Sequence, residues 1–178
     1  MIKRVLLLFL CTLALLWGKE YDPTVTAIQA KLFPKIALLE QHVKEEKTST
    51  LRISILAIDA DRNAAVQFKE QIEAAYPEGL LGRRMVVAVE RFDPEAIQRP
   101  DAVIVLAHQP EVLRSIATWA NTHGIVSFAY DPFDLEAGFL VSIYFGKSAK
   151  PYLNRGVMQE FRFIFDHYLL RLSKFYAP

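Results

Sequence analysis

Residues 102–107, AVIVLA, form an unbroken apolar run directly after Asp101. A strand that is apolar on both faces is typical of the centre of a parallel sheet, because helices cover such a sheet on both sides. Further segments of strand length, rich in β-branched and aromatic residues, lie on either side of it along the chain. They are 51–58 (LRISILAI), 84–90 (RMVVAVE), 125–130 (IVSFAY) and 139–145 (FLVSIYF). The sequence therefore predicts a sheet core over residues 51–145.

Amphipathic segments separate these strands. Residues 62–76 place Ala65, Phe68 and Ile72 on one helical face, and we expect Asp61 to cap that helix. Pro110 begins a second helix that runs to about Thr122. Strands that alternate with helices predict an α/β fold, here one three-layer domain with a mostly parallel sheet flanked by helices. Residues 147–154 are expected to form a loop.

Two more helices are predicted outside the sheet core. The N-terminal one covers about residues 23–45, and Pro34 is expected to kink or split it near Phe33. The C-terminal one covers about residues 157–175. Their predicted apolar faces are Val25, Ile28, Leu32, Ile36, Leu39 and Val43 for the first, and Val157, Phe161, Phe165, Tyr168, Leu172 and Phe175 for the second.

The first eighteen residues resemble a secretory signal peptide. Lys3 and Arg4 precede an apolar run from Val5 to Trp17, and Gly18 follows it. Thirteen helical residues reach only about 20 Å, which is short of a bilayer core. We therefore expect residues 1–18 to be removed and residues 19–178 to act as one domain in the periplasm. The alternative is an uncleaved anchor in the inner membrane, with the domain facing the periplasm.

Charge and cysteine content exclude several function classes. The chain has 21 basic and 20 acidic residues, and residues 1–18 hold two of the basic ones and no acid, so residues 19–178 carry a net charge of −1. That balance gives no reason to expect nucleic acid. The single cysteine, Cys11, leaves with the signal peptide, which excludes a disulfide or a thiol nucleophile from the mature chain.

Polar residues follow three of the predicted strands. Asp59 and Asp61 follow the first, His108 and Gln109 the third, and Asp131, Phe133 and Asp134 the fourth. Ligands of open α/β sheets collect at the carboxyl ends of the strands, so Asp59, Asp61, His108, Asp131 and Phe133 are the candidate ligand-binding residues. The alternative is that these aspartates only cap helices and form turns.

No cofactor or metal site is predicted. The seven glycines never form a phosphate-binding loop, and the first strand-to-helix turn carries two carboxylates instead. His42, His108, His123 and His167 are not spaced as paired metal ligands. The sequence also lacks the nucleophile motifs of hydrolases, so we expect the protein not to be an enzyme.

Aromatic residues are dense near the C-terminus. Phe161, Phe163, Phe165 and Tyr168 are candidate partner-binding residues, because exposed contiguous apolar area often marks a contact surface. The surface would suit another protein or a second copy of this chain. The alternative is that this segment packs on two sides within the domain.

Taken together, several stretches resemble the YfiR-like family of small periplasmic proteins. That family combines a signal peptide, an N-terminal helix, a strand of the LRIxIL type, a central apolar strand and a final helix with Leu-Leu-x-Leu. The stretches here are AIQAKLFPKIALLEQ (27–41), LRISILAID (51–59), AVIVLAH (102–108), GIVSFAYDPFDLEAGFLVSIYF (124–145) and KPYLNRGVMQEFRFIFDHYLLRLSKFY (150–176). The chain lacks the cysteine pairs of some members, and residues 42–46 replace their usual tryptophan-proline.

The resemblance implies an α/β lobe without catalytic machinery. Such a lobe would regulate an inner-membrane signalling protein, often a diguanylate cyclase, by direct contact. The second hypothesis is a single-lobe binding protein for a small solute, with its site at the strand ends. The third is an enzyme that uses Asp59, His108 and Asp131.

Overall fold

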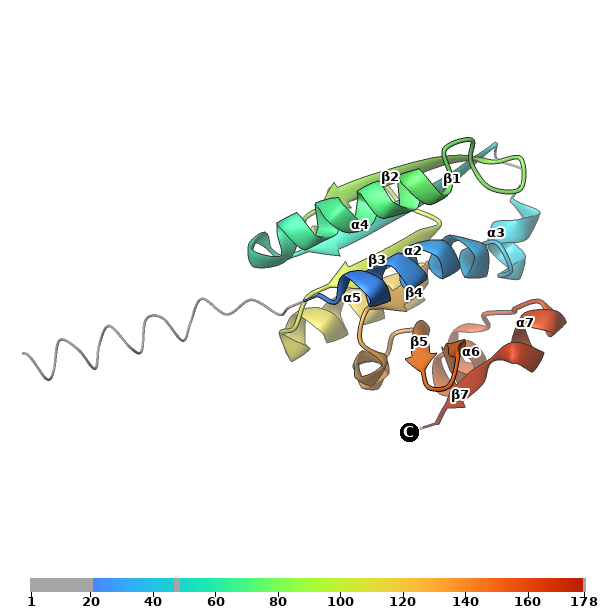
Figure 1. Ribbon diagram of the computed structural model, residues 1–178. Helices are drawn as coiled ribbons and strands as arrows, with labels where there is room; N and C mark the ends of the chain where they lie inside the picture. Colours follow the sequence, from blue (N-terminus) through green and yellow to red (C-terminus); the bar gives the residue numbers. More distant parts are fainter. Residues whose placement is uncertain (1–20, 47–48, 178) are drawn as a thin grey trace, which may run out of the picture.

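Seven strands form one sheet in the computed structural model of the chain, which describes residues 21–46 and 49–177 (Figure 1). The order across the sheet is β2-β1-β3-β4-β5-β6-β7. The predicted signal peptide lies outside the described residues. The strands are β1 (Thr50–Ala57), β2 (Arg84–Glu90), β3 (Ala102–Leu106), β4 (Val126–Ala129), β5 (Val141–Phe145), β6 (Ala149–Asn154) and β7 (Lys174–Tyr176).

The first five strands are parallel, and β3 lies at the centre of this group. All five residues of β3 are buried. Its alternate side chains belong to two separate apolar clusters: Ile104 and Leu106 face one layer of helices, and Val103 and Val105 face the other. The predicted α/β fold with a helix-covered, mostly parallel sheet is confirmed.

Helices occupy both faces of the sheet. α2 (Pro23–Ala37) and α4 (Arg62–Ala75) share one face, and α5 (Pro110–Thr122) covers the other. Phe33 of α2 stacks on Phe128 of β4, with 4.4 Å between ring centroids. α4 and α5 match the helices expected from the sequence. No helix among the described residues is long and apolar enough to cross a bilayer.

The N-terminal helix ends earlier than predicted. α2 stops at Ala37, and a short helix, α3 (Gln41–Glu45), follows it after a corner. Pro34 lies inside α2. The helix therefore ends about one turn after Phe33, where the kink or split was expected. The buried face is also rotated from the predicted one: of the residues predicted for it within α2, only Ile36 is buried, and Val25, Ile28 and Leu32 are half-buried. The buried residues of α2 are Thr26, Gln29, Ala30, Phe33, Pro34, Ile36 and Ala37. Gln29 is fully buried and donates from Nε2 to the carbonyl oxygen of Tyr130 at 2.7 Å.

The single C-terminal helix predicted over residues 157–175 is wrong. α6 (Arg155–Phe161) ends at Arg162, whose φ of 61° places it in the left-handed region. Phe163 and Phe165 are buried while Ile164 between them is exposed, a period of two that suits extended chain. Asp166 then accepts a hydrogen bond from the Tyr168 amide and begins α7 (His167–Leu172), and β7 completes the sheet.

Residues 147–154, predicted to be a loop, contain strand β6. It forms an antiparallel hairpin with β5, in which Val141 lies opposite Leu153 and Ile143 opposite Pro151. β7 pairs only with Tyr152–Asn154, so Pro151 has a strand partner on one side only. A proline, which has no amide hydrogen to donate, is tolerated at such an edge-like position.

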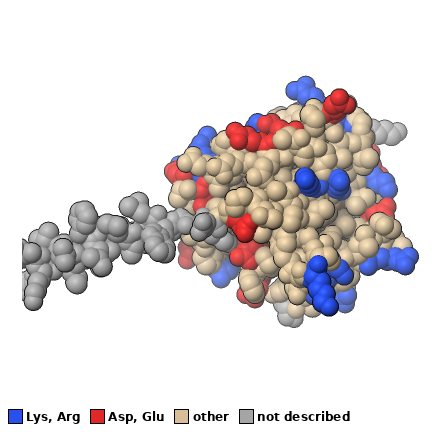
Figure 2. Space-filling model, in the orientation of Figure 1, with Lys and Arg blue, Asp and Glu red and all other residues tan. Residues whose placement is uncertain are grey.

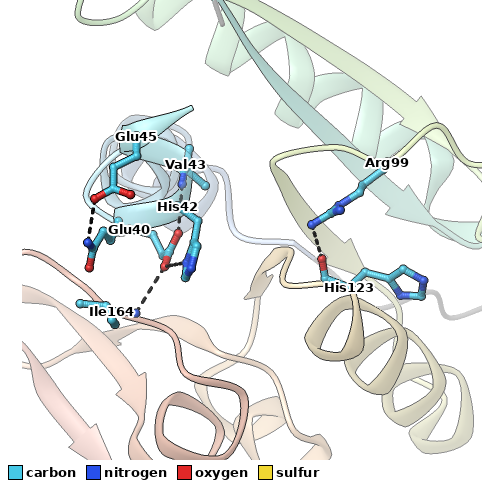
Figure 3. Close-up of polar contacts among 8 residues, drawn as sticks. Glu40, His42, Val43, Glu45, Arg99, His123 and Ile164 are labelled. Carbon is cyan, nitrogen blue, oxygen red and sulfur yellow. Dashed lines mark hydrogen bonds and ion pairs between the residues drawn. The ribbon is translucent and has the colours of Figure 1, made fainter. Parts of the chain in front are cut away.

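The carboxylate of Glu40 joins the N-terminal helices to the C-terminal segment (Figure 3). Glu40 is fully buried, and its side chain accepts hydrogen bonds from the backbone amides of Val43 at 3.1 Å and Ile164 at 3.3 Å. His42 Nδ1 lies 3.0 Å from the same carboxylate. Backbone bonds from Gln41 to Ile164 and from Asp166 to Leu39 flank it. Segments more than a hundred residues apart are thus fixed at one point.

We expect Glu40→Gln to lower the free energy of unfolding by roughly 1–3 kcal/mol, because an amide offers one acceptor where two donors converge. Glu45→Gln is the matched control: Glu45 is exposed on the same short helix and accepts only from Gln41. Urea denaturation of both variants measures the difference. Equal stability of the two variants would show that Glu40 does not hold the segments together.

Candidate functional site

Three parallel strands end side by side at one edge of the sheet. Ala57 of β1 pairs with Leu106 of β3, and Val105 of β3 pairs with Ala129 of β4. The loops that follow these strands therefore share one edge, as the sequence predicted. We call this edge the rim and define it by residues 58–61, 107–110 and 130–137.

Asp61 is the buried carboxylate of the rim. It occupies the N-cap position of α4, as predicted, but its side chain makes no capping hydrogen bond. It ends the short 3-10 helix Asp59–Asp61 and turns inward. It is only 2% exposed, and its Oδ2 makes no hydrogen bond among the described residues. His108 Nδ1 lies 3.5 Å from this oxygen. A carboxylate oxygen buried with so little compensation is costly.

Tyr21, which the sequence analysis did not single out, lies beside Asp61. Its ring meets that of Tyr130 edge to face, with 4.8 Å between centroids. The Tyr21 hydroxyl faces the Asp61 carboxylate. Burial, and next the charge of Asp61, raise the pKa of Tyr21 well above its ordinary value of 10.0. Tyr21 precedes the N-cap Asp22, so only the path of α2 across the sheet brings it to the rim.

A hollow of about 400 Å³ opens beside these buried groups. It lies between the start of α5 and the 3-10 helix Pro132–Ala137. Its lining combines both signs of charge with an aromatic ring, and Phe133 is 78% exposed. The side chains that carry this chemistry are His108, Arg114, Phe133, Asp134 and Glu136.

The other polar residues predicted for the rim, Asp59, Gln109 and Asp131, make no polar contact with His108 that the structure shows among the described residues. Asp131 accepts a hydrogen bond from the Phe133 amide at 3.0 Å, which is the turn-forming role named as the alternative. Asp59 is exposed, and no hydrogen bond or ion pair joins it to His108 within residues 21–46 and 49–177. Gln109 occupies the N-cap position of α5 without a side-chain bond. The rim thus brings His108 to Asp61 rather than to Asp59 or Asp131.

The aromatic residues near the C-terminus divide between core and surface. Phe163 and Phe165 are 5% and 4% exposed and belong to the main apolar cluster. Phe161 is half-buried against the same cluster. Tyr168 is 69% exposed, and Ile164 and Leu172, which precede and follow it by four residues, are each about half exposed. Of the four predicted partner-binding residues, only Tyr168 projects well into solvent.

Apart from the contacts of His42 with Glu40 and of His108 with Asp61, the histidines do not gather at one site. Within the part of the chain that the structure describes, no three histidine, cysteine, aspartate or glutamate side chains are grouped so that they could hold a metal ion.

Comparisons with known proteins identify fold neighbours. No protein-family model and no curated protein matches the chain. A conserved domain protein from Vibrio cholerae O1 biovar El Tor aligns with a TM-score of 0.56 and 12% identity over 84% of this chain. The ABC domain in complex with L-Trp from Streptococcus pneumoniae aligns with a TM-score of 0.57 and 11% identity over 82% of it. The chain spans 59% of the length of each structure. At such identities the likeness shows a shared fold.

The raised pKa of Tyr21 predicts a loss of stability in alkali. The unfolded chain releases this proton near pH 10 while the folded chain retains it, so the free energy of unfolding falls as pH rises above about 10. Tyr21→Phe removes that contribution and should flatten the fall. Asp61→Asn should flatten it less, because burial is the larger cause. Denaturation between neutral and alkaline pH measures the slopes, and identical slopes for all three proteins would contradict the assignment.

Proposed function

We propose that this chain is a non-catalytic periplasmic binding protein whose rim takes a small zwitterionic solute of the amino acid class. The observation that supports this most directly is the hollow lined by His108, a half-exposed side chain that lies in front of the buried Asp61. The hollow lies at the carboxyl ends of parallel strands, where open α/β sheets bind their ligands. Its volume is within the range of small-molecule sites, roughly 300–1,000 Å³.

The lining of the hollow suits a zwitterion. Arg114 and His108 offer donors to a carboxylate, whereas Asp134 and Glu136 offer acceptors to an ammonium group. The exposed ring of Phe133 supplies a face for an apolar or aromatic side chain. The buried Asp61 faces His108 from inside the protein and holds the imidazole at the wall of the hollow. The fold neighbour in complex with L-Trp supports a solute of this class.

Titration calorimetry with L-tryptophan and other amino acids tests the proposal. We expect saturable binding that weakens roughly two- to tenfold in Phe133→Ser, the range expected for one lost aromatic contact. Phe145→Ser is the matched control, because Phe145 is also an exposed phenylalanine but does not line the hollow. Tryptamine and indole-3-propionate each lack one charge and should bind more weakly. Absence of saturable heat with every amino acid would contradict the proposal.

We propose contact regulation of an inner-membrane signalling protein, such as a diguanylate cyclase, as a second function. It is favoured by three exposed apolar side chains close together in sequence: Ile164, Tyr168 and Leu172. Exposed apolar side chains that gather in one segment often mark interaction sites. Binding would restrain the partner until a signal that prefers the free state releases it. This function also follows from the resemblance to the YfiR-like family.

Affinity purification of the full chain from membranes of its own cells tests this second function. We expect the tagged protein to recover one inner-membrane sensor, identified by mass spectrometry. Tyr168→Glu should abolish recovery, because a charge on an apolar contact surface must be desolvated. Leu81→Glu is the control, since Leu81 is 80% exposed and distant in sequence from Tyr168. Equal recovery with both variants would show that this surface is not the contact.

A further inference from the structure

A second concave site lies between α2 and α7, away from the rim residues. It is a groove of about 490 Å³ whose third wall is the start of β6. The lining is largely apolar: Leu169 and Ile36 are buried in its floor, and the side chains of Tyr168 and Leu172 are largely exposed at its border. The apolar lining residues are Leu32, Ile36, Leu39, Pro151, Tyr168, Leu169 and Leu172.

Three cations border this groove, each from a different element. Lys35 comes from α2, Lys150 from β6 and Arg171 from α7, and no acidic residue lines the groove. None of the three forms an ion pair or hydrogen bond with another side chain among the described residues. Figure 2 shows mainly blue side chains at the lower right, the part of the molecule where β5, β7 and α7 lie in Figure 1.

Three other cations of this region already have an aromatic or acidic partner, which distinguishes them from Lys35, Lys150 and Arg171. Lys174 Nζ lies 3.5 Å from the centre of the Tyr144 ring, and the guanidinium of Arg155 lies 4.8 Å from that of Phe175. Lys44 pairs with Asp166 at 3.4 Å. The groove therefore combines an apolar floor with unpaired positive charge, which matches a ligand that has a hydrocarbon body and an anionic head.

The surroundings of the groove disfavour an extended peptide. β7 pairs only with Tyr152–Asn154, so the part of β6 at the groove, Ala149–Pro151, is hydrogen-bonded to β5 alone. This free edge is three residues long and includes Pro151, which has no amide hydrogen to donate, so it offers few partners to an added strand. A single hydrocarbon chain needs no backbone partners and gains from apolar contact alone. Arg171 can receive a carboxylate with two parallel hydrogen bonds, and the two lysines add point charges beside it.

We propose that the groove binds a single-chain amphiphile with a carboxylate head, the chemistry of a fatty acid. The chain lies on Ile36, Leu39 and Leu169 between the two helices. The carboxylate lies at the border formed by Lys35, Lys150 and Arg171. This site is independent of the zwitterion site at the rim.

Calorimetry on the full chain with dodecanoate, kept below its micelle concentration, tests the proposal. We expect saturable binding that becomes roughly tenfold weaker when Lys35, Lys150 and Arg171 are all changed to Glu, the sum of three partly exposed charge contacts. Lys31→Glu with Arg62→Glu and Arg84→Glu is the matched control, because these three cations are exposed and lie outside the groove. Dodecyltrimethylammonium, with the same tail and opposite charge, should bind the wild type more weakly.

The other outcomes would overturn the proposal. Equal dodecanoate affinity in both triple variants would show that the cations do not hold the head. Binding of an acidic amphipathic peptide without binding of dodecanoate would assign the groove to a protein partner. Sedimentation with anionic vesicles without binding of free dodecanoate would assign it to a membrane surface. Phe133→Ser should retain dodecanoate binding, which separates this test from that of the rim.

Discussion

The Glu40 carboxylate is the interaction on which the C-terminal third of the structure depends. It is buried, no Lys or Arg within residues 21–46 and 49–177 pairs with it, and the backbone amides of Val43 and Ile164 converge on it. Hydrogen bonds to a charged acceptor are about twice as strong as neutral ones, and they are stronger where water is excluded. Together with the flanking backbone bonds between residues 39–41 and 164–166, this side chain fixes the α2–α3 corner to the chain that leads into α7. Helices α2 and α7 form two walls of the apolar groove.

The rim depends on a different constraint, the parallel arrangement of β1, β3 and β4. Three loops must lie together when three adjacent strands point the same way, whatever their sequences. The aspartates of the rim differ in whether they make the local hydrogen bond that is usual for a loop aspartate. Asp131 accepts the turn amide of Phe133, whereas the Asp61 side chain makes no capping bond to α4 and is turned inward. The buried Asp61 carboxylate lies behind His108, and it is His108 that lines the hollow.

The sequence was sufficient to predict an element where the pattern of apolar residues directly reflects which side chains are buried. AVIVLA is buried as a central strand, and the helices after β1 and β3 lie where the apolar spacing predicted. It was insufficient where distant contacts decide the conformation. Phe163 and Phe165 fit a helix as well as a strand until the pairing of Phe165 with Glu40 is known. Residues 147–154 were expected to form a loop because nothing local shows that β6 pairs with β5 and β7. Tyr21 could not be placed in the site without the path of α2.

Helix α2 lines the groove at its C-terminal end, and its N-terminal end begins beside the rim. The residue before its cap, Tyr21, covers Asp61 at the rim, and its last turn carries Lys35 and Ile36 into the groove. Fifteen helical residues span about 22 Å, so this one helix runs from the rim to the groove. If one ligand binds more tightly to one position of α2, it changes the affinity for the other ligand. The second ligand then changes the affinity for the first by the same factor. Any coupling between the two proposed sites would therefore require a displacement of α2, because the groove and the hollow have no lining residue in common.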